Sequence, residues 1–202
     1  DHLPASALIL GGGFVAAEMA HVFSAFGCRV TLVNRSGRLL RQEDAEVSQR
    51  FTQIARERWD VRLDTEVEKV ERHERGVRAH LDDGTSVDAE LLLVATGRRP
   101  NSDDLGLDRA GVEVDERGLV VVDAYQRTSA PGVWALGDVA NPYQLKHVSN
   151  REARVVRHNL LHPDDLVEAD HRYVPSAVFS HPQVASVGLG EEEARERGQA
   201  FV

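Results

Sequence analysis

The sequence predicts an α/β fold whose first half is built on a parallel β-sheet. An apolar run at 7–10 is followed by a glycine-rich turn and then by a helical pattern of apolar residues. A second apolar strand at 29–33 follows this helix, as expected for a βαβ arrangement. Alternating strands joined by an Asp-Asp-Gly turn come later, and they predict an antiparallel β-meander.

The elements of the first half are expected in a definite order. The first helix runs from Phe14 to Phe26 and ends at Gly27, a residue that tolerates the left-handed conformation of a helix end. Its larger apolar residues at helical spacing are Val15, Met19, Val22, Phe23 and Phe26. The second helix presents an apolar face made of Ala45, Val47, Phe51, Ile54 and Ala55. Strands are expected at 61–63, 67–72, 77–81 and 91–95, the last covered on both faces because it is continuously apolar.

The second half has a different pattern. The segment Arg98–Asn101 is expected to cross between domains. The expected elements are strands at 119–122 and 133–136, a helix at 149–161, strands at 177–180 and 185–187, and a charged helix at 191–197 closed by Gly198.

Composition limits the classes of function. The 202 residues carry a net charge of −9, from 24 basic and 33 acidic side chains, which argues against nucleic acid as a partner. Apolar residues make up 42%, enough for a core, and no run has the length of a membrane span or the features of a signal peptide. The one cysteine, Cys28, is expected to be a small core residue rather than a reactive thiol. Because the first residue is Asp rather than Met, the chain is expected to be a cut or processed piece.

The glycine-rich turn is typical of a dinucleotide site. Gly11, Gly13 and Ala16 occupy the positions of a G-x-G-x-x-A motif between a strand and a helix. Gly11 allows the tight turn, Gly13 lets a pyrophosphate approach the backbone, and Ala16 lets the helix pack closely on the strand. The amino end of the helix favours anionic phosphates. The alternative is a glycine-rich turn that binds nothing.

The residues after the second strand favour NADP(H) over NAD(H). An acidic residue at this point would bind the ribose hydroxyls of NAD, but the chain has Asn34. Arg35, Arg38 and Arg41 follow, and guanidinium groups attract a 2′-phosphate that a carboxylate would repel. Two alternatives remain: the arginines form a solvated basic patch, or Asn34 serves an unphosphorylated ribose.

Two other groups of residues suggest sites. Asp138 comes directly after a predicted strand and Gly137, where a carboxylate can accept hydrogen bonds from a polyol such as the ribityl chain of a flavin; the alternative is a helix or turn cap. His158 and His162 share one helix face, but no third metal ligand with suitable spacing is evident, so no metal site is predicted.

Four ordered motifs extend over essentially the whole chain. They are Gly11-x-Gly13-x-x-Ala16-x-Glu18, Ala95-Thr96-Gly97-Arg98-x-Pro100-Asn101, Ala135-Leu136-Gly137-Asp138-Val139, and Val178-Phe179-Ser180-His181-Pro182 with Val187-Gly188. In this order they resemble the flavoprotein (pyridine nucleotide-disulfide) reductases. The segments Pro142–Val148 and Arg154–Leu161 are most similar to the mycothione reductase branch, which reduces the disulfide of mycothiol with NADPH.

The resemblance implies a fold and an activity. Residues 1–98 would form an NADPH-binding, Rossmann-like three-layer domain with a β-meander, and residues 99–165 a central segment that completes the FAD-binding region. Residues 166–202 would begin a truncated α+β dimerisation domain. The parent would be a cytoplasmic homodimer that passes electrons from NADPH through FAD and a redox-active cysteine pair to a small-molecule disulfide. Neither nucleic acid nor membrane would be a partner.

The resemblance also assigns residues. The NADPH-binding set is Gly11, Gly13, Phe14, Val15, Ala16, Glu18, Arg35, Arg41 and Gly97. The FAD-binding set is Gly137, Asp138, Leu145, Lys146 and His147. Glu18 matches a glutamate near the nicotinamide, with a solvent-facing helix residue as the alternative. Arg38 has no clear counterpart in the family.

The chain also departs from the family pattern. It contains neither the family's amino-terminal FAD fingerprint, nor its cysteine pair, nor the catalytic His-Pro…Glu motif, so no catalytic residue is assigned in this chain. His162-Pro163 and His181-Pro182 lie in other contexts. The chain is therefore expected to bind NADPH without turnover and to retain FAD weakly. The alternatives are a glutathione reductase-like or dihydrolipoamide dehydrogenase-like member, or a stand-alone NADP-binding module. Arg35 and Arg41 argue against the NAD-using enzymes, and the Gly137-Asp138 pair argues against the module.

Overall fold

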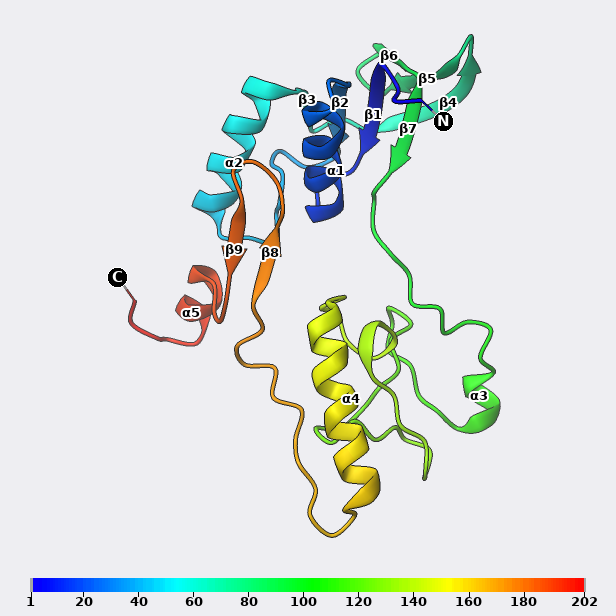
Figure 1. Cartoon of the computed structure of the whole chain (residues 1–202), viewed down its shortest axis with the longest axis vertical. Helices are drawn as coiled ribbons and strands as arrows, with labels where there is room; N and C mark the ends of the chain where they lie inside the picture. Colours follow the sequence, from blue (N-terminus) through cyan, green and yellow to red (C-terminus); the bar gives the residue numbers. More distant parts are fainter. Residues whose placement is uncertain (1, 202) are drawn as a thin grey trace. The chain divides into compact units, whose positions relative to one another are not determined.

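The computed structural model describes residues 2–201, which fold into two compact units (Figure 1). The first unit combines residues up to Gly97 with the segment from Ala177 onward, and the second runs from Arg98 to Ser176. The sequence-based segments 99–165 and 166–202 are functional assignments and stay predictions. No helix among the described residues is long and apolar enough to cross a membrane.

A four-stranded parallel sheet forms the centre of the first unit, with the strand order β3-β2-β1-β7. Its strands are β1 (Ser6–Leu10), β2 (Arg29–Asn34), β3 (Asp60–Leu63) and β7 (Leu91–Val94). The register aligns Leu10 with Val33 on β2 and with Val94 on β7. The carboxyl ends of these three strands therefore meet at one edge of the sheet, the edge at which open α/β sheets bind ligands.

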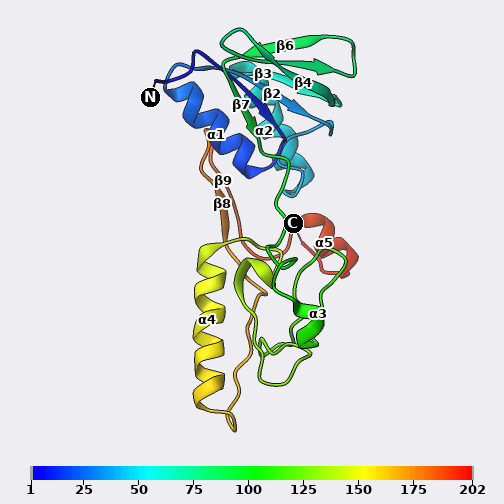
Figure 2. The same ribbon diagram turned by 90° about the vertical axis from the view of Figure 1, so that its right-hand side faces the viewer.

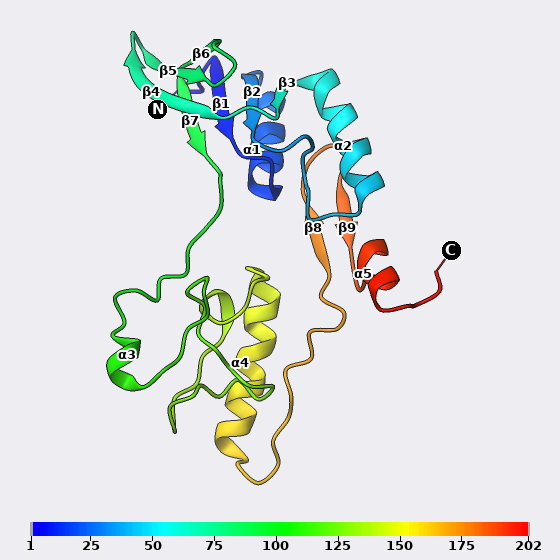
Figure 3. The same cartoon turned by 180° about the vertical axis from the view of Figure 1, so that it is seen from behind.

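Two helices cover one face of this sheet, α1 (Phe14–Ala25) and α2 (Ala45–Arg58) (Figures 1 and 3). Ile9 and Leu32 of the sheet lie in one buried apolar cluster with Phe51 of α2. The buried residues of α1 are Ala16, Ala17 and Ala20, whereas Val22 and Phe26 are exposed. Val47 of the expected α2 face is also exposed. Burial in α1 follows small size rather than hydrophobicity, because this helix lies close to the sheet.

The opposite face of the sheet packs against an antiparallel meander of β4 (Val67–His73), β5 (Gly76–Leu81) and β6 (Ser86–Ala89). Leu8 and Val33 face it, since alternate residues of a strand point to opposite faces. The predicted Asp-Asp-Gly turn joins β5 to β6, with Gly84 at a φ of +81°. The predicted three-layer arrangement of helices, sheet and meander is therefore confirmed.

The strand β7 differs from its prediction. Its residues Leu91–Leu93 are only half-buried, and Val94 is 61% exposed. Leu93 packs against the apolar cluster on the helix side and Leu92 against the cluster on the meander side, so the expected cover on both faces is present but incomplete.

The last segment of the chain packs on α1 and α2 and so belongs to the first unit. The hairpin strands β8 (Ser176–Val178) and β9 (Val184–Ser186) place Val178 and Val184 in the same apolar cluster as α1 and α2 (Figure 3). The helix α5 (Glu191–Glu196) follows, and Gly198 lies just beyond it at a φ of +64°.

The second unit contains α3 (Leu107–Ala110) and the long helix α4 (Lys146–Leu161) (Figure 2). It also contains the 3-10 turn η1 (Gly137–Val139). Val112, Val120 and Ala130 form its small apolar core. The strands expected at 119–122 and 133–136 are not regular strands: each contributes one isolated bridge. Glycine turns precede both segments, at Gly118 and Gly132, and interrupt any longer ladder.

Candidate functional site

The glycine turn lies at the carboxyl edge of the parallel sheet. Gly11 has a φ of +123°, and a Cβ at this position would lie 2.3 Å from the carbonyl oxygen of Ala95. The Gly11 amide also donates to the Val33 carbonyl at 2.9 Å. Gly11 is thus required by its backbone conformation and by the close approach of the segment after β7.

Gly13 has the opposite environment. It is the N-cap residue of α1, it is exposed, and a Cβ placed on it would meet no atom within 4 Å. Among residues 2–201, no side chain forms a hydrogen bond that caps this helix. Ala16 is completely buried against the core one turn later, as its small size predicts. The amino end of α1 is therefore open to a ligand, and its backbone N–H groups and dipole favour an anion.

The loop after β2 is held directly on the glycine turn. Asn34 is buried, and its Nδ2 donates to the carbonyls of Ser36 at 2.9 Å and Arg38 at 3.1 Å. The Leu40 amide donates to the Gly12 carbonyl at 2.6 Å. Both amide hydrogens of Asn34 are used within the loop, so this residue holds the loop together rather than donating to a ribose.

The arginines of this loop are available to a ligand. Arg35 and Arg41 are exposed and Arg38 is half-buried. Within residues 2–201, none of the three guanidinium groups makes a hydrogen bond or an ion pair. An exposed guanidinium group is well suited to a phosphate group.

The acidic helix α5 lies beside Arg38 and Arg41, a neighbour that the sequence did not predict. A hollow of about 560 Å³ is lined by Arg38, Arg41 and Arg195 together with Glu43, Asp44, Glu191, Glu192, Glu193 and Glu196. The Asp44 carboxylate accepts the Glu191 amide at 2.8 Å and so anchors α5 there. Asp44 and Glu191 are 147 residues apart, so no local sequence pattern could have indicated the contact.

Glu18 and Gly97 lie in the same unit. The Oε1 atom of Glu18 accepts the Phe179 amide at 2.9 Å, and Glu18 is half-buried, so this residue is held in place rather than fully solvent-facing; its place near a nicotinamide stays a prediction. Gly97 follows β7 with a φ of +132°, is exposed, and has open space where a Cβ would be. The structure therefore brings Gly97 to the edge of the sheet that holds Gly11, while Glu18 joins α1 to the end of β8.

The second candidate site is the turn at Gly137 and Asp138. Gly137 is buried with a φ of +73°, and Asp138 next to it is exposed. The Asp138 carboxylate caps neither η1 nor α4, and within residues 2–201 it has no hydrogen bond or ion pair. The cap alternative is therefore wrong, and both oxygens are available to hydroxyl donors. Leu145 is the N-cap residue of α4, and Lys146 and His147 are exposed in its first turn.

Glu152, a residue that was not predicted from the sequence, holds this turn in place. Its side chain is 1% exposed, and it accepts the Gly137 amide at 2.6 Å. A signal was present, because Glu152 lies on the same helix face as the buried residues Val148, Val155 and Val156. A carboxylate in the middle of an apolar helical stripe indicates a specific buried partner.

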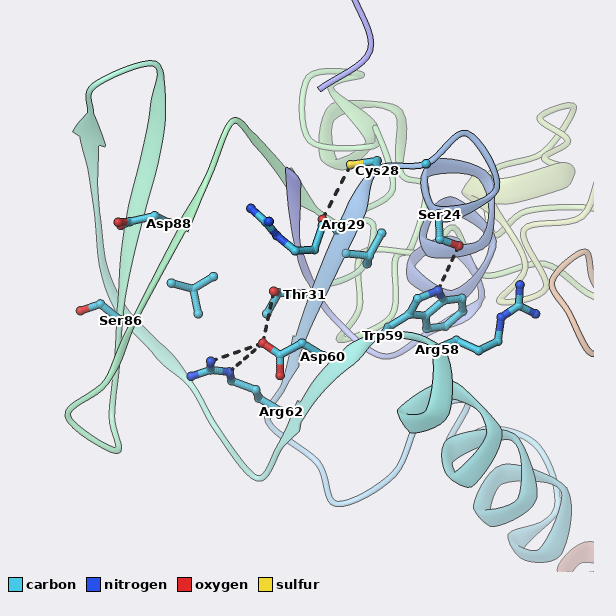
Figure 4. Close-up of a pocket in the computed structure, with 13 residues that line it drawn as sticks. Ser24, Cys28, Arg29, Thr31, Arg58, Trp59, Asp60, Arg62, Ser86 and Asp88 are labelled. Atoms are coloured by element: carbon cyan, nitrogen blue, oxygen red, sulfur yellow. Dashed lines mark hydrogen bonds and ion pairs between the residues drawn. The ribbon is translucent and has the colours of Figure 1, made fainter. Parts of the chain in front are cut away.

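The remaining polar features do not form a further site. No group of three potential metal ligands occurs within residues 2–201, and the His158 ring bonds the Asp165 carbonyl at 2.8 Å. A hollow of about 490 Å³ near Cys28 lies where β2 and β3 begin (Figure 4). Asp60 and Arg62 form an ion pair within it, and it contains none of the predicted site residues.

Cys28 itself is a buried core residue. Its side chain belongs to a residue that is 4% exposed, and burial raises the pKa of its thiol, as expected for a core cysteine.

Comparison with known proteins identifies the protein family to which the chain belongs. The chain belongs to the pyridine nucleotide-disulphide oxidoreductase family, whose model matches residues 1–153. Mycothione reductase of Mycobacterium tuberculosis (strain H37Rv) is 54% identical over 200 residues, which cover 97% of this chain and 43% of that protein. The probable pyridine nucleotide-disulfide oxidoreductase RclA of Escherichia coli K12 is 37% identical over 197 residues.

Solved structures show the same fold. The flavoprotein disulfide reductase RclA of Escherichia coli superposes with a TM-score of 0.87 at 36% identity, covering 96% of this chain and 45% of that one. LpdA of Mycobacterium tuberculosis superposes with a TM-score of 0.87 at 27% identity, covering 98% of this chain. The chain spans less than half the length of the relatives it matches.

Proposed function

We propose that this chain is the NADPH-binding portion of an FAD-dependent disulfide reductase of the mycothione reductase kind. One observation carries the proposal: a loop with exposed Arg35 and Arg41, which have no ion-pair partner within residues 2–201, is hydrogen-bonded through Leu40 directly to the glycine turn. The groups suited to a pyrophosphate and those suited to a 2′-phosphate therefore lie on two backbone segments that a hydrogen bond joins.

The residues of the first unit fit this nucleotide. The open space at Gly13 lets a pyrophosphate reach the first turn of α1, where the helix dipole favours its charge. Arg35 and Arg41 bind the 2′-phosphate, which an NADH molecule lacks. In the proposed site Glu18 lies near the nicotinamide, held by the Phe179 amide.

The second unit fits part of an FAD site. The exposed Asp138 carboxylate, without a partner among residues 2–201, accepts hydrogen bonds from ribityl hydroxyls. Leu145, Lys146 and His147 lie beside the flavin ring in this proposal. When bound, the two cofactors supply the hydride and electron transfer, and the chain supplies binding and orientation.

The substrate class follows from the relatives. The 54% identity to a protein named mycothione reductase favours a mycothiol-type disulfide over glutathione or lipoamide. Within this proposal, residues 1–98 bind NADPH, 99–165 complete the FAD region and 166–202 begin the domain that forms a homodimer. This chain has one cysteine, so the redox-active pair lies outside it and the chain alone reduces no disulfide.

Calorimetric titration with NADPH and with NADH tests the nucleotide assignment. The wild-type chain is expected to prefer NADPH. Arg35→Ala and Arg41→Ala should each weaken NADPH binding by about tenfold to a hundredfold, the value of a hydrogen-bonded charge pair, and leave NADH binding unchanged. Arg50→Ala is the matched control, because Arg50 is exposed on α2 and lies outside the loop.

The other results contradict the proposal in different ways. Equal affinity for the two nucleotides would make the arginines a solvated patch and favour NAD-linked relatives such as the dihydrolipoyl dehydrogenases. Binding of neither would assign the glycine turn to packing alone. Disulfide reduction by the pure chain would overturn the assignment of the redox centre to another part of the protein.

A further inference from the structure

A buried carboxylate in α4 has no part in the proposed chemistry. Glu152 is 1% exposed, and a carboxylate is almost never buried to this extent unless it is paired. It accepts the Gly137 amide at 2.6 Å, the Asn141 Nδ2 at 3.0 Å on each oxygen, and the His171 Nε2 at 2.8 Å. These donors satisfy the charge that burial would otherwise make costly.

The same contacts fix the backbone of the Gly137 turn from both sides. The Gly137 carbonyl accepts the Asn141 Nδ2 at 3.0 Å, while its amide donates to Glu152. A Cβ on Gly137 would lie 3.0 Å from the Ser149 Oγ, so the turn is also pressed against α4. The Tyr143 amide donates to the Asn141 Oδ1 at 3.0 Å and orients that side chain.

We propose that Glu152 is a positioning residue that holds the Gly137 turn so that Asp138 presents its carboxylate outward to a polyol ligand. The ligand part of this inference rests on the proposed function, because it takes the polyol to be the ribityl chain of a flavin. An apolar residue at position 152 would avoid the cost of a buried charge, but it would leave the Gly137 amide without a partner.

His171 contributes through Glu152. Its ring lies 5.3 Å from the Tyr143 ring, and its Nε2 bonds the carboxylate oxygen Oε1. His171→Phe keeps an aromatic ring at this position and removes the donor. This variant should loosen the Gly137 turn less than a change at Glu152, because the Gly137 and Asn141 contacts to Glu152 are retained.

Amide hydrogen exchange of the whole chain, followed residue by residue by NMR, tests the positioning role. In Glu152→Gln, the amide exchange of Gly137 should rise by about tenfold to a hundredfold, the value of a hydrogen bond to a charged group. The α4 amides should keep their wild-type exchange rates, and Glu152→Asp should restore part of the protection. Glu116→Gln is the control with the same charge change, since Glu116 is exposed in the same unit.

Flavin binding, measured by quenching of FAD fluorescence, supplies the second readout. Glu152→Gln and Asp138→Asn should both weaken FAD binding relative to wild type, although only Glu152→Gln should alter exchange at Gly137. Unchanged Gly137 exchange in Glu152→Gln would overturn the positioning role. If the wild-type chain binds no FAD while the exchange effect is present, the proposed flavin assignment fails and the positioning of the turn stands.

Discussion

The Gly11–Gly13 turn of the first unit and the Gly137–Asp138 turn of the second, the two proposed ligand sites, are built in different ways. The first turn leaves open space beside its backbone, because a Cβ on Gly13 would meet no atom within 4 Å. The guanidinium groups of the adjoining loop have no partner among residues 2–201. The second relies on a buried acid, Glu152, that holds the backbone while Asp138 points outward. A site for an anion can use backbone amides at a helix end, whereas a site for neutral hydroxyls needs an acceptor fixed in position.

The largest effect is expected from Gly11→Ala, which tests whether space or backbone conformation matters more in the first turn. The new methyl group would lie 2.3 Å from the Ala95 carbonyl oxygen at a φ that L residues avoid. Overpacking and strain together should lower the free energy of unfolding by about 3 kcal/mol or more. Thermal unfolding measures this loss.

Gly13→Ala is the matched variant. Its φ is −85° and its Cβ would meet no atom within 4 Å, so stability should change by less than about 1 kcal/mol. NADPH affinity should nevertheless fall, because the methyl group occupies the space left for the pyrophosphate. Equal destabilisation by the two variants would contradict the distinction between a packed and an open glycine.

Asn34→Ala tests whether the first site also depends on a buried polar support. The change removes two hydrogen bonds from Asn34 Nδ2 and leaves the Ser36 and Arg38 carbonyls without this donor. Unfolding free energy should fall by about 1–3 kcal/mol. The preference for NADPH over NADH should shrink, because the arginine loop loses its fixed shape. A preference equal to wild type by calorimetry would assign Asn34 to stability only.

Cys28, the cysteine of this chain, is buried outside both proposed sites, so neither site is expected to use a thiol. Burial, and then the nearby charge of Glu90, raise the pKa of this thiol in the folded chain. Its contribution to stability is thus complete below the pKa of the unfolded thiol and is lost as pH rises through the higher folded value. At pH 8, iodoacetamide should alkylate the folded chain on the order of tenfold more slowly than the denatured chain. Equal rates would contradict a buried core thiol.

The smallest effect is expected from Glu192→Gln on α5. This exposed side chain lines the hollow that contains Arg38 and Arg41, and its charge opposes an incoming phosphate. Removing one exposed charge should raise NADPH affinity by only about twofold to fivefold, and less at high salt. Glu57→Gln on α2 is the control. No change at low ionic strength would mean that α5 does not influence the arginine loop.

Sequence reasoning predicted the local parts of this fold well. The order of the strand, glycine turn and α1, and the hairpin at Gly84, depend on neighbouring residues and were predictable from them. The buried face of α1 was less predictable, because the close packing of the helix on the sheet selects Ala16 and Ala20 over Phe26. The strands expected at 119–122 and 133–136 follow an apolar pattern that glycine turns interrupt before a ladder forms.

The residues of the candidate sites also divide into those that nearby sequence predicts and those that depend on distant contacts. The glycine turn and the arginine loop each follow a strand of one βαβ unit, so their position at the same edge of the sheet was predictable from the sequence. Glu18 bonds the amide of Phe179, which is 161 residues away, and no spacing rule predicts such a contact. Glu152 was predictable in principle from its place in an apolar helical stripe, but its partners in the Gly137 turn were not.

The hydrogen bond from the Leu40 amide to the Gly12 carbonyl has a consequence for coenzyme engineering. Leu40 has a φ of +49°, an uncommon conformation for a leucine, and the loop enters α2 a few residues later. A loop transplanted from an NADH-dependent relative has to reproduce this bond as well as replace Arg35 and Arg41. Exchange of the arginines alone would therefore change the charge of the loop and keep this hydrogen bond, whereas exchange of the whole loop would disturb both the loop and the glycine turn of the proposed nucleotide site.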